Sequence, residues 1–427
     1  MTVLPGVADG KLKDLSRLKQ GPLARALEAL NGGGEETRLV GGAVRDLALG
    51  ASVFDLDLAT TAAPSEVMRR ATAAAIKLAP TGLAHGTVTI VLDGQPIEIT
   101  TLREDLETDG RHAKVAFGRD FSADARRRDF TINALSLAAD GRVYDYVGGL
   151  HDLAARRVRF IGDPAARIRE DYLRILRFFR FSARFASGDL DAEGLSASIR
   201  EREGIAQLSR ERVRSELLKL LSAPHAGEVV RTMGHCGFLE PILGGLAYPT
   251  RLTRLIAIET ARGPKPDAVL RLAALGAAIP ENAERLQARL RLANSEQSRI
   301  AAAAGALIGL HGIVEPPSPG DLRRLLFTAR RGAARDALAL AQAESGVSPD
   351  DPGFQSADRF LAHSPEPELP FSGADLIARG VPRGRAVGEA LRSFQGLWVG
   401  AGFPAEPDAL ERLLDEALTR SGGVGGL

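Results

Sequence analysis

The hydrophobic pattern of the chain changes once, near Leu150, and this change constrains the fold more than any other feature. Before it, short runs rich in β-branched residues alternate with glycine-containing turns, a pattern typical of strands in a mixed α and β domain. After it, long amphipathic stretches rich in alanine, leucine and arginine predict helices. The expected strands are Arg38–Val40, Val53–Leu58, Thr87–Leu92 and Ile97–Leu102. We therefore expect an α+β fold, with a small head that contains a sheet and an all-helical remainder.

The helical remainder is divided by segments rich in proline and glycine. The expected helices are Ala165–Phe185, Arg210–Leu221, Thr250–Leu275, Glu281–Leu310 and Leu322–Ser345, with breaks at Val314–Gly320, Ser348–Gly353 and His363–Gly373. A length of 427 residues fits about two to four domains. We expect an N-terminal extension (1–25), the head (26–150), a helical neck (151–225), a helical body (226–345) and a helical tail (346–427).

The composition excludes several classes of protein. With 44% hydrophobic and 26% charged residues, the chain has the composition of a globular protein and not of a disordered one. No run approaches the ~18 apolar residues that a membrane span needs, so we expect no membrane contact. The N-terminus lacks the apolar core of a secretory signal, and Cys236 is the only cysteine, which together favour a cytoplasmic protein.

Positive charge is concentrated in one segment although the net charge is only +1. Between Arg156 and Arg184 there are nine arginines and only three acidic residues. A phosphate-rich partner would need such a block, but taken alone the block favours a solvated helix in a protein that uses arginine more than lysine.

A two-glycine turn follows the first expected strand. Gly41 and Gly42 would let the backbone approach a ligand closely, and free N–H groups at the start of the next helix would attract phosphate. Arg45 lies one turn further along and would reach the same anion. Taken alone, this pattern also fits an ordinary connection between a strand and a helix.

Two aspartates lie on the next expected strand. Asp55 and Asp57 are two residues apart and therefore share one face, while the apolar residues between and beside them point into the core. Two carboxylates this close repel each other unless a cation lies between them, and Mg²⁺ prefers carboxylate and phosphate oxygens. Glu98, on a later strand, is a candidate third carboxylate.

Two further blocks contain residues suited to nucleotide recognition. Arg127 and Arg128 can clamp phosphate oxygens, and Asp129 and Asn133 can hold ribose hydroxyls. The alternative is a basic turn with Asp129 as a helix cap. In the second block the polar residues recur every third position on one helical face, namely Asp171, Arg174, Arg177 and Arg180. Here the alternative is an i,i+3 salt bridge on a solvated helix.

These four blocks, in this order, resemble the class II tRNA nucleotidyltransferases, the CCA-adding enzymes, which are close relatives of the bacterial poly(A) polymerases. The resemblance covers Thr37 to Leu221 closely, including Glu211 to Leu217, and is loose beyond it. It implies a polymerase-β-like head with a mixed sheet. It also implies the addition of CMP, CMP and AMP to the tRNA 3′ end from CTP and ATP, with poly(A) addition as the alternative. An RNA-binding module with an inactive head is disfavoured because both aspartates are present.

The resemblance also implies a role for each block. Asp55 and Asp57, with Glu98, would hold two Mg²⁺ ions. The nucleotide-binding residues would be Gly41, Gly42, Arg45, Arg127, Arg128, Asp129, Asn133, Asp171, Arg174, Arg177 and Arg180. A mobile loop corresponding to Thr101–His112 would take part in the change from CTP to ATP.

The types of side chain allow an argument about base choice. Ionised Asp171 only accepts hydrogen bonds and Arg174 only donates them, which matches the amino group and ring nitrogen that cytosine and adenine share. Guanine and uracil present the reverse pattern. Two histidines are not assigned to catalysis. His85 fits a turn before a strand, and we expect no phosphohydrolase activity from His151 and Asp152, because the other histidines are isolated.

Overall fold

The computed structural model describes residues 4–53, 55–79, 83, 86–105, 115–263 and 265–420. The chain forms two compact units, Met1–Val229 and Val230–Leu427. The first unit contains the sheet and the helices that follow it, and the second is helical. The predicted α+β fold, with a head that contains a sheet and a helical remainder, is confirmed.

The described residues of the first unit place seven strands in one mixed sheet, in the order β11-β10-β3-β4-β7-β6-β5. Strands β4 and β7 are parallel, and the other neighbours are antiparallel. The sheet strands are β3 (Thr37–Val40), β4 (Leu56–Thr60), β5 (Lys77–Ala79), β6 (Thr87–Leu92), β7 (Gln95–Thr101), β10 (Ser136–Leu137) and β11 (Val143–Tyr144). Short hairpins pair β1 (Val7–Ala8) with β2 (Lys11–Leu12) and β8 (Arg103–Asp105) with β9 (Val115–Phe117).

Buried and exposed side chains alternate at the start of β4 and in the middle of β7. Leu56 and Leu58 are buried on β4 and Asp57 between them is exposed, as predicted. On β7, Glu98 is exposed and lies in register with Asp57. β4 begins at Leu56 rather than at the predicted Val53, so Asp55 lies just before the strand; Phe54 is outside the described residues.

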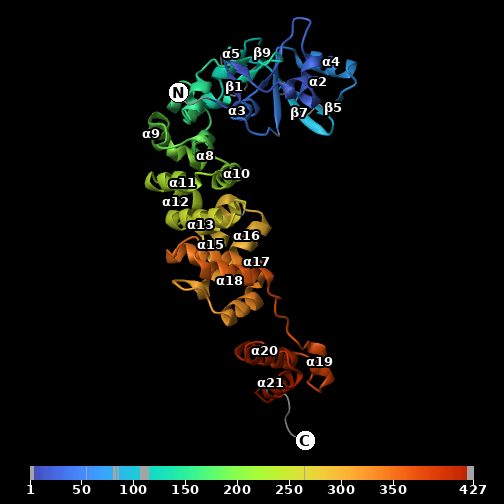
Figure 1. Cartoon of the computed structure of the whole chain (residues 1–427), viewed down its shortest axis with the longest axis vertical. Coiled ribbons are helices and arrows are strands. Elements are labelled where there is room, and N and C mark those ends of the chain that lie inside the picture. Colours follow the sequence, from blue (N-terminus) through green and yellow to red (C-terminus); the bar gives the residue numbers. More distant parts are fainter. Residues whose placement is uncertain are drawn as a thin grey trace. The chain divides into compact units, whose positions relative to one another are not determined.

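The helices of the first unit cover the sheet and continue beyond it (Figure 1). They are α1 (Ser16–Lys19), α2 (Gly21–Leu30), α3 (Gly42–Ala48), α4 (Pro64–Ala73), α5 (Phe121–Arg126), the 3-10 helix Thr131–Asn133, α6 (Gly149–Ala154), α7 (Pro164–Glu170), α8 (Leu173–Phe185), α9 (Ala192–Arg200), the 3-10 helix Arg202–Gln207, α10 (Arg210–Leu221) and α11 (Ala226–His235), which crosses into the second unit.

The helix predicted over Ala165–Phe185 is interrupted in the structure. Asp171 has an extended backbone, φ −158° and ψ 106°, and ends α7. Its carboxylate accepts a hydrogen bond from the backbone N–H of Leu173 at 3.1 Å, near the start of α8. A side chain that satisfies a free N–H in this way favours a new helix start. The prediction of one continuous helix was therefore wrong at this residue.

Aromatic packing fixes α8 against the head. The rings of Phe130 and Phe160 lie 4.8 Å apart between centroids, and those of Phe160 and Phe178 lie 5.5 Å apart. Phe181 contacts Phe130 edge-on at 5.4 Å. Because the apolar face of α8 packs against the head in this way, the orientation of its polar face relative to the head is fixed.

The second unit contains the helices that follow α11. Two of the predicted helices, Thr250–Leu275 and Glu281–Leu310, are each divided into two α-helices in the structure. These are α12 (Leu239–Leu243), α13 (Pro249–Arg262), α14 (Ala268–Gly276), α15 (Glu281–Leu290), α16 (Asn294–Leu307), the 3-10 helix Ile308–Leu310, α17 (Pro319–Ser345), α18 (Pro352–His363), α19 (Gly373–Ala378), α20 (Arg385–Gly400) and α21 (Pro407–Arg420). α17 contains one non-helical residue, Arg330, with φ 63° and ψ 161°.

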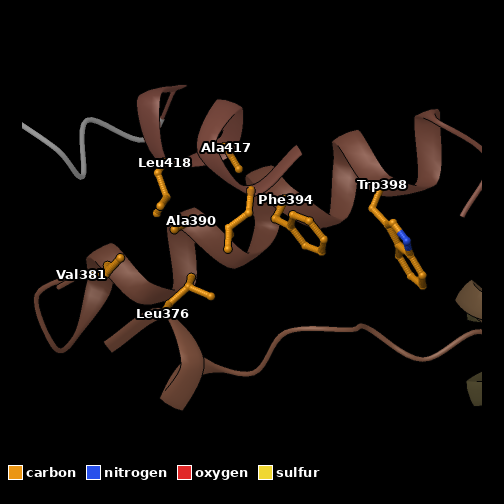
Figure 2. Packing of buried hydrophobic residues seen from close by; sticks show 8 residues of the cluster. Leu376, Val381, Ala390, Phe394, Trp398, Ala417 and Leu418 are labelled. Atoms are coloured by element: carbon orange, nitrogen blue, oxygen red, sulfur yellow. The ribbon is translucent and has the colours of Figure 1, made fainter. Parts of the chain in front are cut away.

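The C-terminal helices enclose an apolar cluster. Phe394 and Trp398 on α20 lie among aliphatic side chains of α19 and α21, as Figure 2 shows. Leu376 and Ala390 are fully buried there. In the part of the chain that the structure describes, no helix combines the length and the apolarity needed to cross a membrane.

Candidate active site

A cavity of about 620 Å³ lies in the first unit, at the polar face of α8. It is lined by Gly41, Gly42, Arg45, Asp57, Arg127, Arg128, Asp129, Asn133, Asp171, Leu173, Arg174, Arg177, Arg180, Phe181, Arg184 and Arg212. The structure thus brings all eleven predicted nucleotide-binding residues to one cavity, although they come from blocks up to 139 residues apart. Of the three predicted metal-binding carboxylates, Asp57 lines the cavity wall.

The three carboxylates interact electrostatically. Partial removal from solvent raises the pKa of Asp57, and the nearby charges of Glu98 and Asp55 raise it further, against the opposing charge of Arg128. Glu98 is the register partner of Asp57 across the parallel strands. Asp57 therefore lies where two neighbouring carboxylates disfavour its charge, and a cation there would stabilise it.

The chemistry of these donors fits Mg²⁺ better than a metal held by protein alone. Among the described residues, no three His, Cys, Asp or Glu side chains are arranged as a metal cluster. Mg²⁺ usually keeps several waters and takes only one or two carboxylates together with substrate phosphates. Asp57 at a cavity rich in arginine, with Asp55 two residues before it, is an open arrangement of this kind.

Gly41 occupies a position that only glycine fits. Its φ of +72° and ψ of −132° lie outside the regions open to other residues. A Cβ atom there would also approach a guanidinium nitrogen of Arg128 to 2.9 Å. The turn predicted to bring backbone close to phosphate therefore lies against the predicted arginine clamp.

One chain of hydrogen bonds joins three of the predicted blocks. Arg45 donates to Asn133 Oδ1 at 2.6 Å, and Asn133 donates through Nδ2 to Asp129 at 3.2 Å. The second oxygen of Asp129 accepts from Arg177 Nε at 2.7 Å. Arg45, Asp129 and Asn133 are each less than 10% exposed. Because buried polar groups are costly when unpaired, this chain fixes the relative positions of α3, the 3-10 helix and α8.

The arginine clamp is held by an acid that the sequence analysis missed. Asp124, which is 3% exposed, accepts from Arg127 with one oxygen and from Arg128 with the other. Arg128 also donates to the backbone carbonyl of Asn133 at 3.3 Å. The spacing of Asp124, three and four residues before the arginines on a helix, was the available signal.

Asp171 and Arg174 line the cavity but do not pair with each other. Asp171 accepts from Arg212 Nη2 at 2.7 Å, and Arg174 donates to Glu170 Oε2 at 2.5 Å. The alternative of an i,i+3 salt bridge between them is therefore wrong. Arg212 was not predicted as a site residue, although it lies inside the Glu211–Leu217 block that supports the resemblance.

Positive charge is dense where Arg45, Arg180 and Arg184 line the cavity. Burial lowers the pKa of Arg45 and of Arg180, and the charge of Arg184 lowers both further. Arg180 lies 2.7 Å from Glu216 Oε2 in an ion pair that partly offsets this repulsion. A polyanion entering the cavity would relieve the remaining repulsion.

Three other predictions concern residues that are not assigned to the cavity. Asp152 is fully buried and accepts from Thr131 Oγ1 at 2.6 Å and from Arg157 and Arg159, which indicates a structural role. His85 and residues 106–112 of the predicted loop Thr101–His112 lie outside the described residues. The prediction of no phosphohydrolase activity remains a prediction.

Two domain families match the chain. Residues 37–159 match the family described as the poly A polymerase head domain. Residues 189–248 match the family described as a probable RNA and SrmB- binding site of polymerase A. The first range contains the sheet, the carboxylates and the arginine clamp. The chain therefore has the head of a polymerase A-type nucleotidyltransferase.

Comparison with individual proteins shows to which family within this class the chain belongs. CCA tRNA nucleotidyltransferase 1, mitochondrial, of Mus musculus is 34% identical over 387 residues, which cover 88% of this chain and 85% of that protein. The CCA-adding enzyme of Lacticaseibacillus paracasei is 32% identical over 94% of this chain and 96% of that protein. The crystal structure of the Bacillus stearothermophilus CCA-adding enzyme in complex with CTP superposes with a TM-score of 0.72 at 29% identity, covering 93% of this chain and 98% of that one. This chain belongs to the CCA-adding tRNA nucleotidyltransferase family, as its motifs predicted.

Proposed function

We propose that this protein adds CCA to the 3′ end of tRNA, using CTP and ATP and releasing pyrophosphate at each step. The observation that carries this function is the single cavity in which three features meet: the carboxylate of Asp57, the arginine clamp, and the pair Asp171 and Arg174. The first two suit nucleotidyl transfer in general, and the third suits selection of cytosine and adenine. The chain's family supports the same conclusion.

Each part of the cavity has a role in the reaction. Asp55 and Asp57, with Glu98 beside them, would hold two Mg²⁺ ions, which when bound lower the pKa of the RNA 3′-hydroxyl and neutralise the triphosphate. Arg127 and Arg128, held in place by Asp124, bind the phosphates of the incoming nucleotide. The 3′-oxygen of the RNA then bonds to the α-phosphorus as the bond to pyrophosphate breaks.

Base choice rests on hydrogen-bond types. Asp171 accepts from the exocyclic amino group of cytosine or adenine, and Arg174 donates to the adjacent ring nitrogen. For guanine or uracil both contacts would be mismatched, at about 1–3 kcal/mol for each unpaired group. Glu170 and Arg212 are the positioning residues of this pair, since they hold Arg174 and Asp171.

The deciding experiment supplies purified protein with tRNA that lacks its terminal CCA. CTP and ATP together should give two CMP and a single AMP. Long A tails on varied RNA would instead support poly(A) addition, which the match to the poly A polymerase head domain keeps as the second candidate.

The assignment of the carboxylates is tested separately. Asp55→Ala should abolish incorporation and leave tRNA binding unchanged in a filter-binding assay. Asp189→Ala, at an exposed aspartate outside the cavity, is the matched control. Retained incorporation in Asp55→Ala would refute the metal site.

We also propose a cytoplasmic location, because the chain contains a single cysteine. The mouse relative is mitochondrial by name. Fractionation of the native cells, with detection of this protein in each fraction, decides between the two compartments.

A further inference from the structure

A second cavity, of about 510 Å³, lies in the first unit. Pockets of this size accommodate small ligands. It is lined by Leu49, Leu153, Arg156, Arg184, Phe185, Lys219, Ser222, Ala223 and Pro224. Its lining contains three cationic side chains and no acidic one, so we call it the basic pocket.

The three cations of the basic pocket are not neutralised by the protein. Within the part of the chain that the structure describes, the side chains of Arg156, Arg184 and Lys219 form neither an ion pair nor a hydrogen bond. Other arginines of α8 differ: Arg177 is paired with Asp129 and Arg180 with Glu216. All three residues are exposed, so the basic pocket presents to solvent positive charge that no acid of the described residues pairs with.

Arg156 holds its place at a conformational cost. It follows α6 with φ +50°, in the left-handed region that glycine adopts most readily at a helix end. This backbone conformation costs more free energy for arginine than for glycine. Strained residues of this kind are concentrated at functional sites.

The basic pocket adjoins the nucleotide cavity. Arg184 lines both. Phe185 lines the basic pocket, and the guanidinium of Arg45 from the nucleotide cavity lies over its ring at 4.1 Å from the centroid. An anion in the basic pocket would therefore lie next to the bound nucleotide and would also neutralise Arg184, which repels Arg45 and Arg180.

We propose that the basic pocket binds backbone phosphate of the RNA strand whose 3′ end is extended. This inference rests on the proposed function, which requires an RNA end beside the nucleotide. Cations next to an aromatic ring are the combination that binds single-stranded nucleic acid, through phosphate contacts and base or sugar packing. The apolar wall formed by Leu49, Leu153 and Phe185 favours a nucleotide unit of RNA over bare pyrophosphate, which offers nothing apolar to pack.

Two single variants test the proposal. Lys219→Ala and Arg156→Gly each remove one cation, and glycine also suits the backbone of residue 156, so its melting temperature should not fall. Lys77→Ala is the matched control, because Lys77 lies exposed on the edge strand β5 and lines neither cavity. Each test variant should weaken binding of tRNA lacking CCA, and of a short single-stranded RNA, by about three- to tenfold. The slope of log Kd against log salt should become shallower by about 0.7 for each lost phosphate contact.

The other measurements identify the source of the phosphate. The KM for CTP and inhibition by pyrophosphate should stay within twofold of wild type in both variants. If RNA binding is unchanged while inhibition by pyrophosphate weakens, the pocket is a pyrophosphate site and the RNA assignment is refuted. If neither changes, or if Lys77→Ala weakens RNA binding as much, the pocket is not an RNA site. Direct RNA binding reports on the pocket even if wild-type protein fails to add CCA, so the two failures are distinguishable.

Discussion

Single side chains in the nucleotide cavity act through partners from other parts of the sequence. Asn133 accepts from Arg45 and donates to Asp129, while Asp129 also accepts from Arg177. Both polar ends of Asn133 are therefore committed within the protein. Asn133 therefore acts as a positioning residue that holds Arg45 and Asp129 in place. Its effect on ribose binding would be indirect, through the positions of these two side chains.

Arg174→Ala should relax discrimination against UTP and GTP. The variant removes the donor that a guanine or uracil edge cannot satisfy, so the ratio of UTP to CTP incorporation should rise about tenfold or more, corresponding to the 1–3 kcal/mol of one mismatched group. Single-turnover incorporation of each nucleotide measures this ratio. Arg169→Ala is the control, because Arg169 pairs with Glu201 and does not line the cavity. Unchanged selectivity in Arg174→Ala would refute the amino-acid template.

At the scale of elements, Asp152 joins α6 to the 3-10 helix that carries Asn133. Burial would raise the pKa of Asp152, but the hydrogen bonds from Thr131 and Arg157 and the charge of Arg159 outweigh this, and its pKa lies below the ordinary 3.8. A carboxylate with a lowered pKa stabilises the fold above the unfolded-state value and loses that contribution as pH falls through the folded-state value.

Asp152→Asn should therefore lower the free energy of unfolding at pH 7 by about 3 kcal/mol, because it leaves buried donors without a charged partner. The variant should also lose less stability than wild type as the pH falls below 3.8. Denaturant titrations followed by circular dichroism between pH 2.5 and 7 measure both effects. The exposed Asp189→Asn should match wild type throughout, and equal acid dependence of Asp152→Asn and wild type would contradict the assignment.

The bend in α17 gives a second prediction for an element. Arg330, at φ 63° and ψ 161°, has a backbone conformation that essentially only glycine adopts without strain. Arg330→Gly should raise the free energy of unfolding by about 1 kcal/mol, since its ion pair with Glu366 is exposed and long at 3.4 Å. Ala329→Gly, one residue earlier in ordinary helix, should lower it by about 0.5–1 kcal/mol. A destabilised Arg330→Gly would show that the bend does not store strain.

The sequence predicted those features that depend on local repetition. The three-residue spacing of Arg174, Arg177 and Arg180 correctly placed them on one helix beside the same cavity, because helical periodicity is local. The break at Asp171 was not predictable, since it depends on one hydrogen bond to Leu173 rather than on a glycine or proline. Arg212 and Glu216, the partners of Asp171 and Arg180, could not be predicted for a different reason. Both come from α10, and only the tertiary packing of α10 on α8 brings Arg212 to the cavity and Glu216 to Arg180.

At the scale of the whole molecule, both cavities lie within the first unit. Saturation with CTP and Mg²⁺ should slow amide hydrogen exchange in residues 41–212 and leave residues 240–420 unchanged. A ligand at 100 times its Kd stabilises the state that binds it by about 2.7 kcal/mol. Hydrogen-exchange mass spectrometry measures the protection by segment. Equal protection of both ranges would contradict a site built from the first unit alone.

The position of Arg184, shared between the two cavities, has an energetic consequence for the order of substrate binding. The anion that binds first neutralises positive charge and so reduces the repulsion among Arg184, Arg45 and Arg180. It also leaves less positive charge to attract the second anion. If relief of crowding dominates, RNA and triphosphate bind with positive cooperativity; if competition for Arg184 dominates, the cooperativity is negative. Thermodynamic reciprocity requires the same factor in both directions, so the affinity for CTP measured with and without RNA reports the sign for both substrates.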